Sequence, residues 1–416
     1  LYNYDEMSSF AQNFRNSQGI SFNQYVDIHT FNPNSLDIGM FSPDGLLNNG
    51  SNYASWYGYD YQGNLIDGVQ PGMNEFLTDK DENGNYKREI GAFQPIYVAG
   101  YIQDKFAFKD LIFNIGVRVD RYDANQEVLK DPYSIYNVLT AGEVSQFGTH
   151  PSNIGSDYVV YVNDNSNPSS ITGYRNGENW YDAEGLPIND PNILNVSKGV
   201  LPMLANPEAL LDGDDALNKG LSADAFEDYI PQVTIMPRIS FNFPISDQAM
   251  FYAYYDVLTQ RPSGNRMNPL DYLFLAYKTT SSVFNPNLKP QKTTNYEIGF
   301  KQALSSSSAL TINAFYREMR DMIQYTRIPY AFPIEYFTYG NIDFGTVKGL
   351  SLAYELRRTK NVTINANYTM QFADGSGSNA TSGANIVTSE QPNLRTTLPL
   401  DSVSYTHLRA HETHND

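Results

Sequence analysis

The chain has 416 residues, a formal net charge of -18 at pH 7 and no cysteine, and its aromatic residues are 32 Tyr, 23 Phe and 2 Trp. The acidic charge argues against nucleic acid as a partner, because phosphate binding needs a basic face. The lack of cysteine excludes disulfide and thiolate chemistry. The mean hydropathy is -0.45, and no apolar run approaches the roughly 18 residues that a spanning helix needs.

Four segments share one pattern, in which two alternating strands are joined by a turn of a few residues. Long polar stretches separate these segments, one of them covering residues 124–233. In an up-and-down antiparallel barrel, this order places all tight turns at one rim and all long loops at the other, as in outer-membrane barrels. In chain order the expected strand pairs are Ile96–Phe106 with Leu111–Tyr122, Met236–Phe243 with Ala249–Val257, Tyr296–Gln302 with Ala309–Arg317, and Gly349–Arg357 with Asn361–Gln371.

The alternation within the strands indicates which face meets lipid. A period of two over nine to eleven residues fits a tilted strand across about 30 Å of hydrocarbon. A soluble β-sandwich also has alternating strands and is the alternative, but strand length, aromatic content and loop asymmetry favour an all-β transmembrane barrel with long extracellular loops. The residues expected to face lipid in the last pair are Leu350, Leu352, Tyr354, Leu356, Val362, Ile364, Ala366 and Tyr368.

The opposite face of the strands carries charge. Glu297 and Lys301 lie four residues apart on the face opposite Ile298 and Phe300, so both are expected to point into the lumen. One interpretation is a solvated wall held by cross-strand pairs, and the other is contact with a plug or a substrate. The same kind of face holds Arg118, Asp120, Arg317, Glu355, Arg357 and Asn365.

The visible strands number about ten: one near the start, eight in the hairpins and one beginning around Asn393. Because open sheet edges are not tolerated in lipid, we expect residues 1–401 to be a fragment of a barrel. The chain begins at Leu1 without an initiator Met, so any export signal is expected upstream. The alternation stops after about Leu400, and residues 402–416 are expected to be a non-native tail. A metal cluster of His407, His411 and His414 is the less favoured interpretation of that tail.

No arrangement typical of catalysis is found: there is no Gly-x-Ser-x-Gly elbow and no Ser/His/Asp order, so an enzyme is not expected. One loop resembles a calcium site, with Asp79, Asp81, Asn83 and Asn85 at alternate positions and a glycine at position 6. Position 12 is Ile90 instead of a bidentate Glu. A polar turn is therefore favoured over calcium, and no other cofactor is expected.

The long loops are dense in aromatic residues, which supply contact area at low entropy cost. Two interpretations stay open: the rings form an outer lip where a ligand first binds, or they pack the loops on one another. The candidate ligand-binding residues are Trp56, Tyr57, Tyr59, Trp180, Tyr181 and Tyr336, and further rings of the same loops are Tyr61, Tyr330, Phe332 and Phe337.

Several motifs together resemble the barrel strands of TonB-dependent outer-membrane receptors. Residues 99–105 (AGYIQDK) and 113–122 (FNIGVRVDRY) resemble a strand pair of that family, and 236–241 (MPRISF) resembles the strand after the next large loop. Residues 285–291 (NPNLKPQ) followed by 296–301 (YEIGFK) resemble its most recognisable signature, and 340–342 with 347–350 resemble the next strand. The order of these motifs fits over about residues 90–400, and the subclass they most resemble is the Oar-like receptors.

The resemblance implies a 22-stranded barrel in the outer membrane of a Gram-negative bacterium, with a carboxypeptidase-like N-terminal domain and a plug upstream. It also implies surrounding outer-membrane lipid, a TonB complex that acts through the plug, and import of a nutrient such as a siderophore, an oligosaccharide, a peptide or cobalamin. The alternatives are a structural or adhesive surface protein and an open porin, and the loop of about 110 residues disfavours the porin.

Overall fold

The computed structural model describes residues 9–82, 84–195, 199–210, 221–262, 270–273, 275, 282–376, 380–382, 384, 398–400 and 404–412. Its main element is one antiparallel sheet with the strand order β1-β2-β10-β11-β12-β13-β14-β15-β16, in which β17 also pairs with β15. The bounds of its strands are β1 Ile96–Phe108, β2 Leu111–Asp123, β10 Gln232–Ser246, β11 Ala249–Gln260, β12 Gln291–Ser305, β13 Ser308–Ile328, β14 Tyr336–Thr359, β15 Val362–Gly375, β16 Leu398–Leu400 and β17 Ser404–Glu412.

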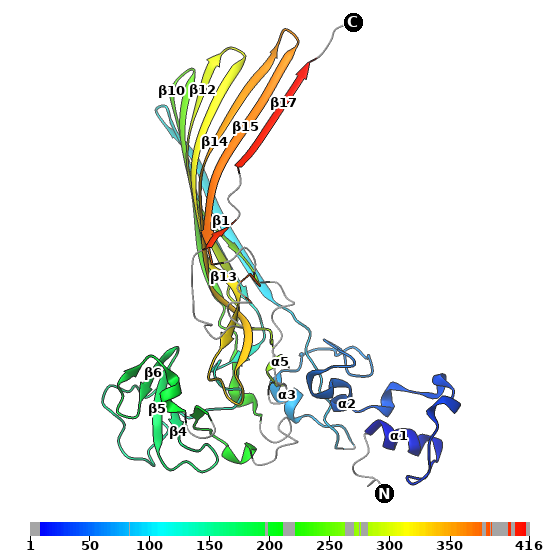
Figure 1. Cartoon of the computed structure of the whole chain (residues 1–416). Helices are drawn as coiled ribbons and strands as arrows, with labels where there is room; N and C mark the ends of the chain where they lie inside the picture. Colours follow the sequence, from blue (N-terminus) through cyan, green and yellow to red (C-terminus); the bar gives the residue numbers. More distant parts are fainter. Residues whose placement is uncertain are drawn as a thin grey trace.

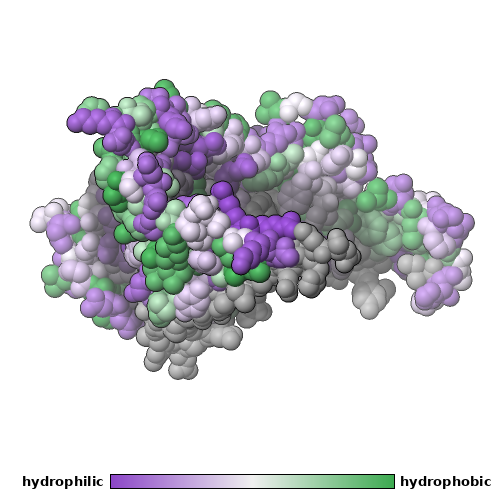
Figure 2. All heavy atoms as spheres, turned by 90° about the horizontal axis from the view of Figure 1, so that it is seen from above, coloured by the Kyte–Doolittle hydropathy of each residue, from purple (hydrophilic) through white to green (hydrophobic). Residues whose placement is uncertain are grey.

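All eight expected hairpin strands form, and each pairs with its neighbour in sequence or across a long loop. The tight turns gather at one end of the sheet and the long connections at the other (Figure 1). The largest difference from the expectation is the length of β13 and β14, which have 21 and 24 residues. Seen from the end with the tight turns, hydrophobic and hydrophilic side chains are interleaved over the molecule (Figure 2).

The register of the strands gathers the apolar alternate positions into rows. One row of directly paired residues crosses eight strands without a polar side chain, and the row two residues further along also contains Phe300, Ile312, Leu352 and Tyr368. A face of this kind is what a barrel presents to lipid. The first row runs Phe106, Phe113, Phe241, Ala253, Ile298, Ala314, Leu350 and Met370.

The other face of the same strands carries the polar positions, as the alternation predicts. Arg238 pairs with Asp256, Asp256 with Asn295, and Asn295 with Arg317, so four neighbouring strands contribute one polar row. Glu355 pairs with Asn365 on the same side of the sheet. In a membrane barrel this face borders the lumen.

The long connections contain short elements of their own. The helices are α1 Ser9–Gln18, α2 Pro43–Leu47, α3 Met73–Thr78 and α5 Leu270–Leu273, and the 3-10 turns are Ile28–Thr30, Pro33–Ser35, Ile38–Met40, Asn48–Gly50, Pro191–Leu194, Pro207–Leu210 and Ala223–Ala225. The small strands are β3 Glu127–Leu129, β4 Val159–Val162, β5 Ile171–Asn176, β6 Asn179–Asp182, β7 Pro187–Ile188, β8 Leu201–Pro202 and β9 Phe226–Asp228. None of the helices in the described part of the chain is long and apolar enough to cross a membrane.

Two small sheets give the stretch after β2 a fold of its own. The strands β7-β6-β5-β4-β8 form a five-stranded sheet, and β3 pairs with β9. Val160 and Val162 of β4 are fully buried, and Tyr174 of β5 packs with them in a separate hydrophobic cluster. We call residues 127–228 the loop module. It was expected only as a long polar stretch.

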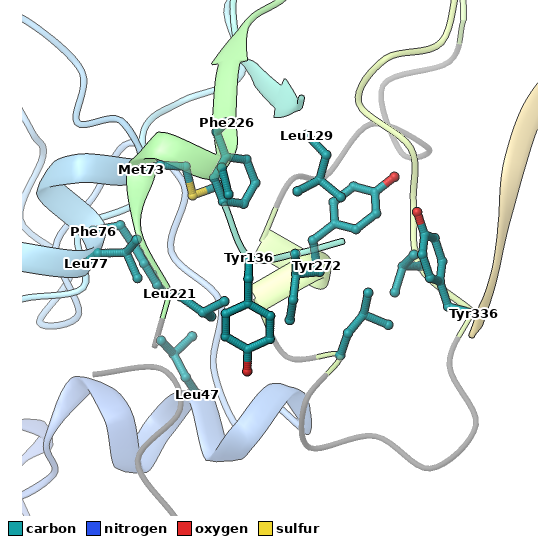
Figure 3. Close-up of a cluster of buried hydrophobic side chains, with 14 of the residues drawn as sticks. Leu47, Met73, Phe76, Leu77, Leu129, Tyr136, Leu221, Phe226, Tyr272 and Tyr336 are labelled. Carbon is teal, nitrogen blue, oxygen red and sulfur yellow. The ribbon is translucent and has the colours of Figure 1, made fainter. Parts of the chain in front are cut away.

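A larger hydrophobic cluster joins several loops into one cap at the end opposite the tight turns. It combines side chains from the first long segment, the loop module, the segment before β12 and the β13–β14 turn (Figure 3). Leu47, Phe76 and Ile135 are each no more than 1 % exposed. The loops are therefore packed on one another by a shared core.

Two expectations about the ends of the chain need comment. A strand near the start was expected, but the described residues from Ser9 to Gln94 contain helices, turns and isolated bridges and no strand of the large sheet, so that expectation is wrong for them. The strand expected from about Asn393 begins outside the described residues, and β16 and β17 follow it. The non-native origin of residues 402–416 stays a prediction, although residues 404–412 pair with β15.

Candidate ligand-binding site

A cavity of about 810 Å³ lies between the loop module and the outer part of the β13–β14 hairpin. Three of the candidate residues line it together, namely Trp180, Tyr181 and Tyr336. Tyr133 and Tyr330 add two further rings. We call this space the aromatic cavity. These three candidate rings therefore lie around one space, and their role in ligand binding stays a prediction.

Trp180 is held at this place by the small sheet. It opposes Arg175 in the β5–β6 pair, and its indole packs at 4.9 Å from the ring of Tyr161 and 6.0 Å from that of Tyr330, measured between centroids. Only 6 % of Trp180 is exposed. Most of its surface therefore serves packing, and only a small part of the ring can meet a ligand in the cavity.

Arg175 connects the small sheet to the start of the loop module. Its guanidinium forms an ion pair with Asp131, donates from Nε to the Tyr161 hydroxyl over 2.9 Å, and lies 4.3 Å from the centre of the Tyr133 ring. Burial raises the pKa of Tyr161, so its hydroxyl stays neutral and accepts from Nε. Because Arg175 is itself only 3 % exposed, loss of a partner would leave a buried charge uncompensated.

Tyr336 docks the module on the hairpin. Its hydroxyl donates to the carbonyl of Pro132 over 2.6 Å, and its ring meets that of Tyr272 edge-on at 5.7 Å. The backbone N–H of Phe332 also donates to the carbonyl of Tyr133 over 2.8 Å. The long β13–β14 hairpin therefore fixes the wall of the aromatic cavity through its turn.

A second cavity, of about 1040 Å³, lies beside α3 and the outer ends of β1 and β2. Its lining includes Tyr57, which is 44 % exposed, and the carboxylates of Glu75, Glu127 and Asp228. Burial raises the pKa of Glu127, and the negative charges of Asp228 and Glu75 raise it further, although the N–H of Met73 donates to this carboxylate and lowers it. We call this space the acidic cavity.

The remaining candidates differ in exposure. Trp56 is 5 % exposed within the cap core, and its Nε1 donates to the carbonyl of Arg88 over 2.9 Å. Tyr59 is 46 % exposed and forms an isolated bridge with Leu65. Of the candidate residues, three are buried, two are exposed, and Tyr181 is of intermediate exposure. Their assignment to ligand binding stays a prediction, and the exposed rings are now its better candidates.

Sequence reasoning missed Tyr133 as part of the aromatic cavity and Arg175 as the charge that holds the Tyr133 ring in place behind it. Arg175 follows the buried Tyr174 in the short strand of residues 171–176, and an isolated charge next to an aromatic residue is the available signal. Tyr133 follows Asp131 and Pro132 in what looks like an ordinary turn, and nothing in the sequence places it next to Trp180.

The loop that resembles a calcium site is a closed polar turn over its described residues. The backbone N–H of Asn85 donates to Oδ1 of Asp81 over 2.9 Å, and its Nδ2 donates to Oδ2 over 3.3 Å. Among the residues with described positions, no group of three or more His, Cys, Asp or Glu side chains could hold a metal ion. Asn83 lies outside those residues. Calcium binding by Asp79, Asp81 and Asn85 stays an untested prediction.

The continuous apolar face, the polar opposite face and the separation of tight turns from long loops define the wall of an outer-membrane β-barrel. A family model described as "TonB dependent receptor-like, beta-barrel" matches residues 2–411. The chain therefore belongs to the TonB-dependent receptor family and comprises part of its barrel domain. No curated protein matches the chain.

Solved structures of receptors and transporters are similar to parts of the chain. They include the FrpB iron transporter from Neisseria meningitidis (F3-3 variant), with 11 % identity, a TM-score of 0.33 and coverage of 67 % of this chain and 26 % of that one. The ferric-catecholate import receptor Fiu from Escherichia coli K12 has 15 % identity, a TM-score of 0.33, and coverage of 70 % and 32 %. The Serratia marcescens hemophore receptor HasR, solved as a double mutant with its hemophore HasA and heme, has 11 % identity, a TM-score of 0.36, and coverage of 67 % and 34 %. This chain spans between about a quarter and a third of these three structures.

Proposed function

We propose that this chain forms part of the barrel wall of an active importer in the outer membrane of a Gram-negative bacterium. In this proposal, an N-terminal plug closes the barrel, the TonB complex acts on the plug, and a small-molecule or oligomeric nutrient is captured at the outer rim. The chain itself has no enzymatic role. The observation that supports this best is the apolar row across eight strands, since a long apolar row on one face, with long loops at one end only, is what a barrel presents to lipid.

The cap supports the capture step. Loops that share a hydrophobic core keep a fixed shape, and the two cavities open between them. Ligand cavities of several hundred Å³ with mixed apolar and polar linings are typical of small-molecule sites. The names of the similar structures mention iron, ferric-catecholate and heme ligands.

The test is energised uptake by the full-length receptor. Cells that depend on it for a limiting nutrient should grow, and growth should stop either when the receptor is deleted or when the TonB complex is removed. A receptor whose deletion changes surface adhesion while uptake is unaffected would instead support the structural or adhesive alternative.

A further inference from the structure

The polar face of the wall carries a set of arginines whose arrangement suggests a ligand. Arg118, Arg238, Arg261 and Arg317 are all exposed. The two aspartates that accompany them are buried, with Asp120 7 % and Asp256 2 % exposed; we call these six residues the arginine strip.

The first half of the strip is organised around Asp120. Arg118 donates from Nε to Oδ1 of Asp120 over 2.7 Å and from Nη2 to the Tyr97 hydroxyl over 2.9 Å, and that hydroxyl also bonds to Asp120. The guanidinium of Arg261 lies over the Tyr97 ring at 4.5 Å from its centre. Asp120 thus accepts hydrogen bonds from two side chains. Tyr97 contacts both arginines, Arg118 through its hydroxyl and Arg261 through its ring.

The second half is organised around Asp256. This carboxylate accepts from Nδ2 of Asn295 over 2.8 Å and from the Tyr254 hydroxyl over 2.9 Å, and Nη2 of Arg238 lies 3.8 Å from it. Arg317 donates from Nε to Oδ1 of Asn295 over 2.7 Å. Because that partner is a neutral amide, it does not cancel the charge of Arg317.

The charge balance favours anions. The strip holds four guanidiniums against two buried aspartates, and Glu297, two residues from Asn295 on the same face, is a further acid of this part of the wall. Lys301 follows on that face of β12. These residues make this part of the wall net positive, in a chain of net charge -18. In Arg118 and Arg317 the Nε is already held, and the remaining N–H groups of an exposed guanidinium form a fork that suits carboxylate and phosphate oxygens.

The position of the strip agrees with a role in transport. Asp256 lies four residues before the end of β11, Asp120 three residues before the end of β2, and Asn295 four residues after the start of β12. All three positions are near the loop ends of the strands, directly below the cap. A solute that leaves the cap and enters the barrel would meet this part of the wall first.

We propose that the arginine strip binds a small anionic solute with two or more carboxylate or phosphate groups during its passage through the barrel. This rests on the proposed import function and adds the charge class of the substrate. The buried aspartates are positioning residues that hold the guanidiniums in place.

The test uses the purified full-length receptor, with citrate as the anionic probe and spermine as the cationic control, followed by titration calorimetry at low salt. We expect citrate to bind, spermine to bind at least ten-fold more weakly, and the citrate affinity to fall as salt is added. The double variant Arg238→Gln/Arg317→Gln should lower the citrate affinity at least ten-fold. Arg357→Gln, on the same face near the tight turns, is the matched control and should retain it.

Unchanged citrate affinity in the double variant, or no citrate binding by the parent receptor, would overturn the proposal. Folding of each variant is checked by its heat-modifiable migration in gels, and Arg238→Lys/Arg317→Lys should restore most of the affinity by returning the charge. Failure of the proposed import function gives a different result from failure of the anion proposal. In the first case energised uptake is absent in cells while citrate still binds the purified receptor.

Discussion

The ring of Tyr252 covers Gly299 across the β11–β12 pair. The two residues are direct partners in the register, and a Cβ placed on Gly299 would lie 2.1 Å from Cζ of that ring. Phe315 lies over Gly349 in the same way on the β13–β14 pair, at 2.5 Å from the corresponding Cβ position. Both rings therefore lie flat against the polar face, a device known to support glycines in sheets.

Gly299→Ala should destabilise the barrel by about 1–3 kcal/mol, because the added methyl group displaces the Tyr252 ring from its place. The measurement is the denaturant or temperature midpoint of the folded full-length receptor, followed by heat-modifiable gel migration. The control is Gly100→Ala in β1, where a Cβ meets nothing within 4 Å. Equal midpoints for the two variants would show that the Tyr252 ring tolerates a Cβ at position 299 without loss of stability.

The faces of the last strand pair can be tested by charge. Ile364 opposes Leu356 in the apolar rows, and its neighbour Asn365 opposes Glu355 on the polar face. Ile364→Arg should cost about 2–4 kcal/mol if the residue lies near the middle of the bilayer, since the lipid face does not tolerate charge.

Asn365→Arg places the same charge one residue away and should cost less than about 1 kcal/mol, because the lumen side is hydrated. Both are measured by the folding of the receptor into lipid vesicles under increasing urea. A larger loss for Asn365→Arg would reverse the assignment of the two faces.

The sequence was sufficient for the eight hairpin strands because lipid on one side and water on the other impose a strict period of two. Where the strands leave the membrane this requirement ends, and the pattern ends with it. The outer parts of β13 and β14 contain register shifts between Met319, Met322 and Ile323, and these parts were not predicted. These outer parts form through contacts with the loop module, whose residues lie far from them in the sequence.

The loop module was missed for a related reason. Its strands have two to six residues, too short to show a period, and the turns between them resemble those of any polar loop. The run of Val159, Val160, Tyr161 and Val162 was the visible signal of a buried strand. The aromatic richness of the loops was recognised from the sequence, but burial decides between packing and ligand contact, and it depends on the tertiary structure.

The two roles of the loop aromatics can now be separated. Trp180→Ala should destabilise the loop module by about 3–5 kcal/mol, as removal of a buried tryptophan usually does. The barrel should keep its midpoint, because the module has hydrophobic clusters of its own. Limited proteolysis should therefore cut within residues 127–228 while the strands stay intact.

Tyr57→Ala is the matched variant for ligand contact, since Tyr57 is exposed and lines the acidic cavity. It should leave the proteolysis pattern of the parent receptor unchanged while the affinity for the imported nutrient falls. If Trp180→Ala leaves the module as resistant as before, the packing role is wrong. If Tyr57→Ala leaves nutrient affinity intact, Tyr57 is not part of the outer lip.

Glu127 should make the cap sensitive to pH. Burial raises the pKa of this carboxyl above its ordinary value of 4.5, and the nearby charges of Asp228 and Glu75 act in the same direction. In the folded state the carboxyl thus holds its proton at pH values where the unfolded chain has released it. As the pH rises from about 4.5 through the folded-state pKa, the folded state binds more protons than the unfolded state, and stability falls.

Glu127→Gln removes this cost, because the amide is neutral and its oxygen can still accept from the N–H of Met73. The variant should stabilise the contact between β3 and the start of α3 at pH 7 and have little effect at pH 4. Hydrogen exchange of the α3 amides at the two pH values, corrected for the intrinsic rates, measures it. Glu82→Gln, at an exposed position four residues after the end of α3 and outside the cavity, is the control and should change neither value. Protection that is equal in parent and Glu127→Gln at pH 7 would mean that the ionised carboxylate is accommodated without cost.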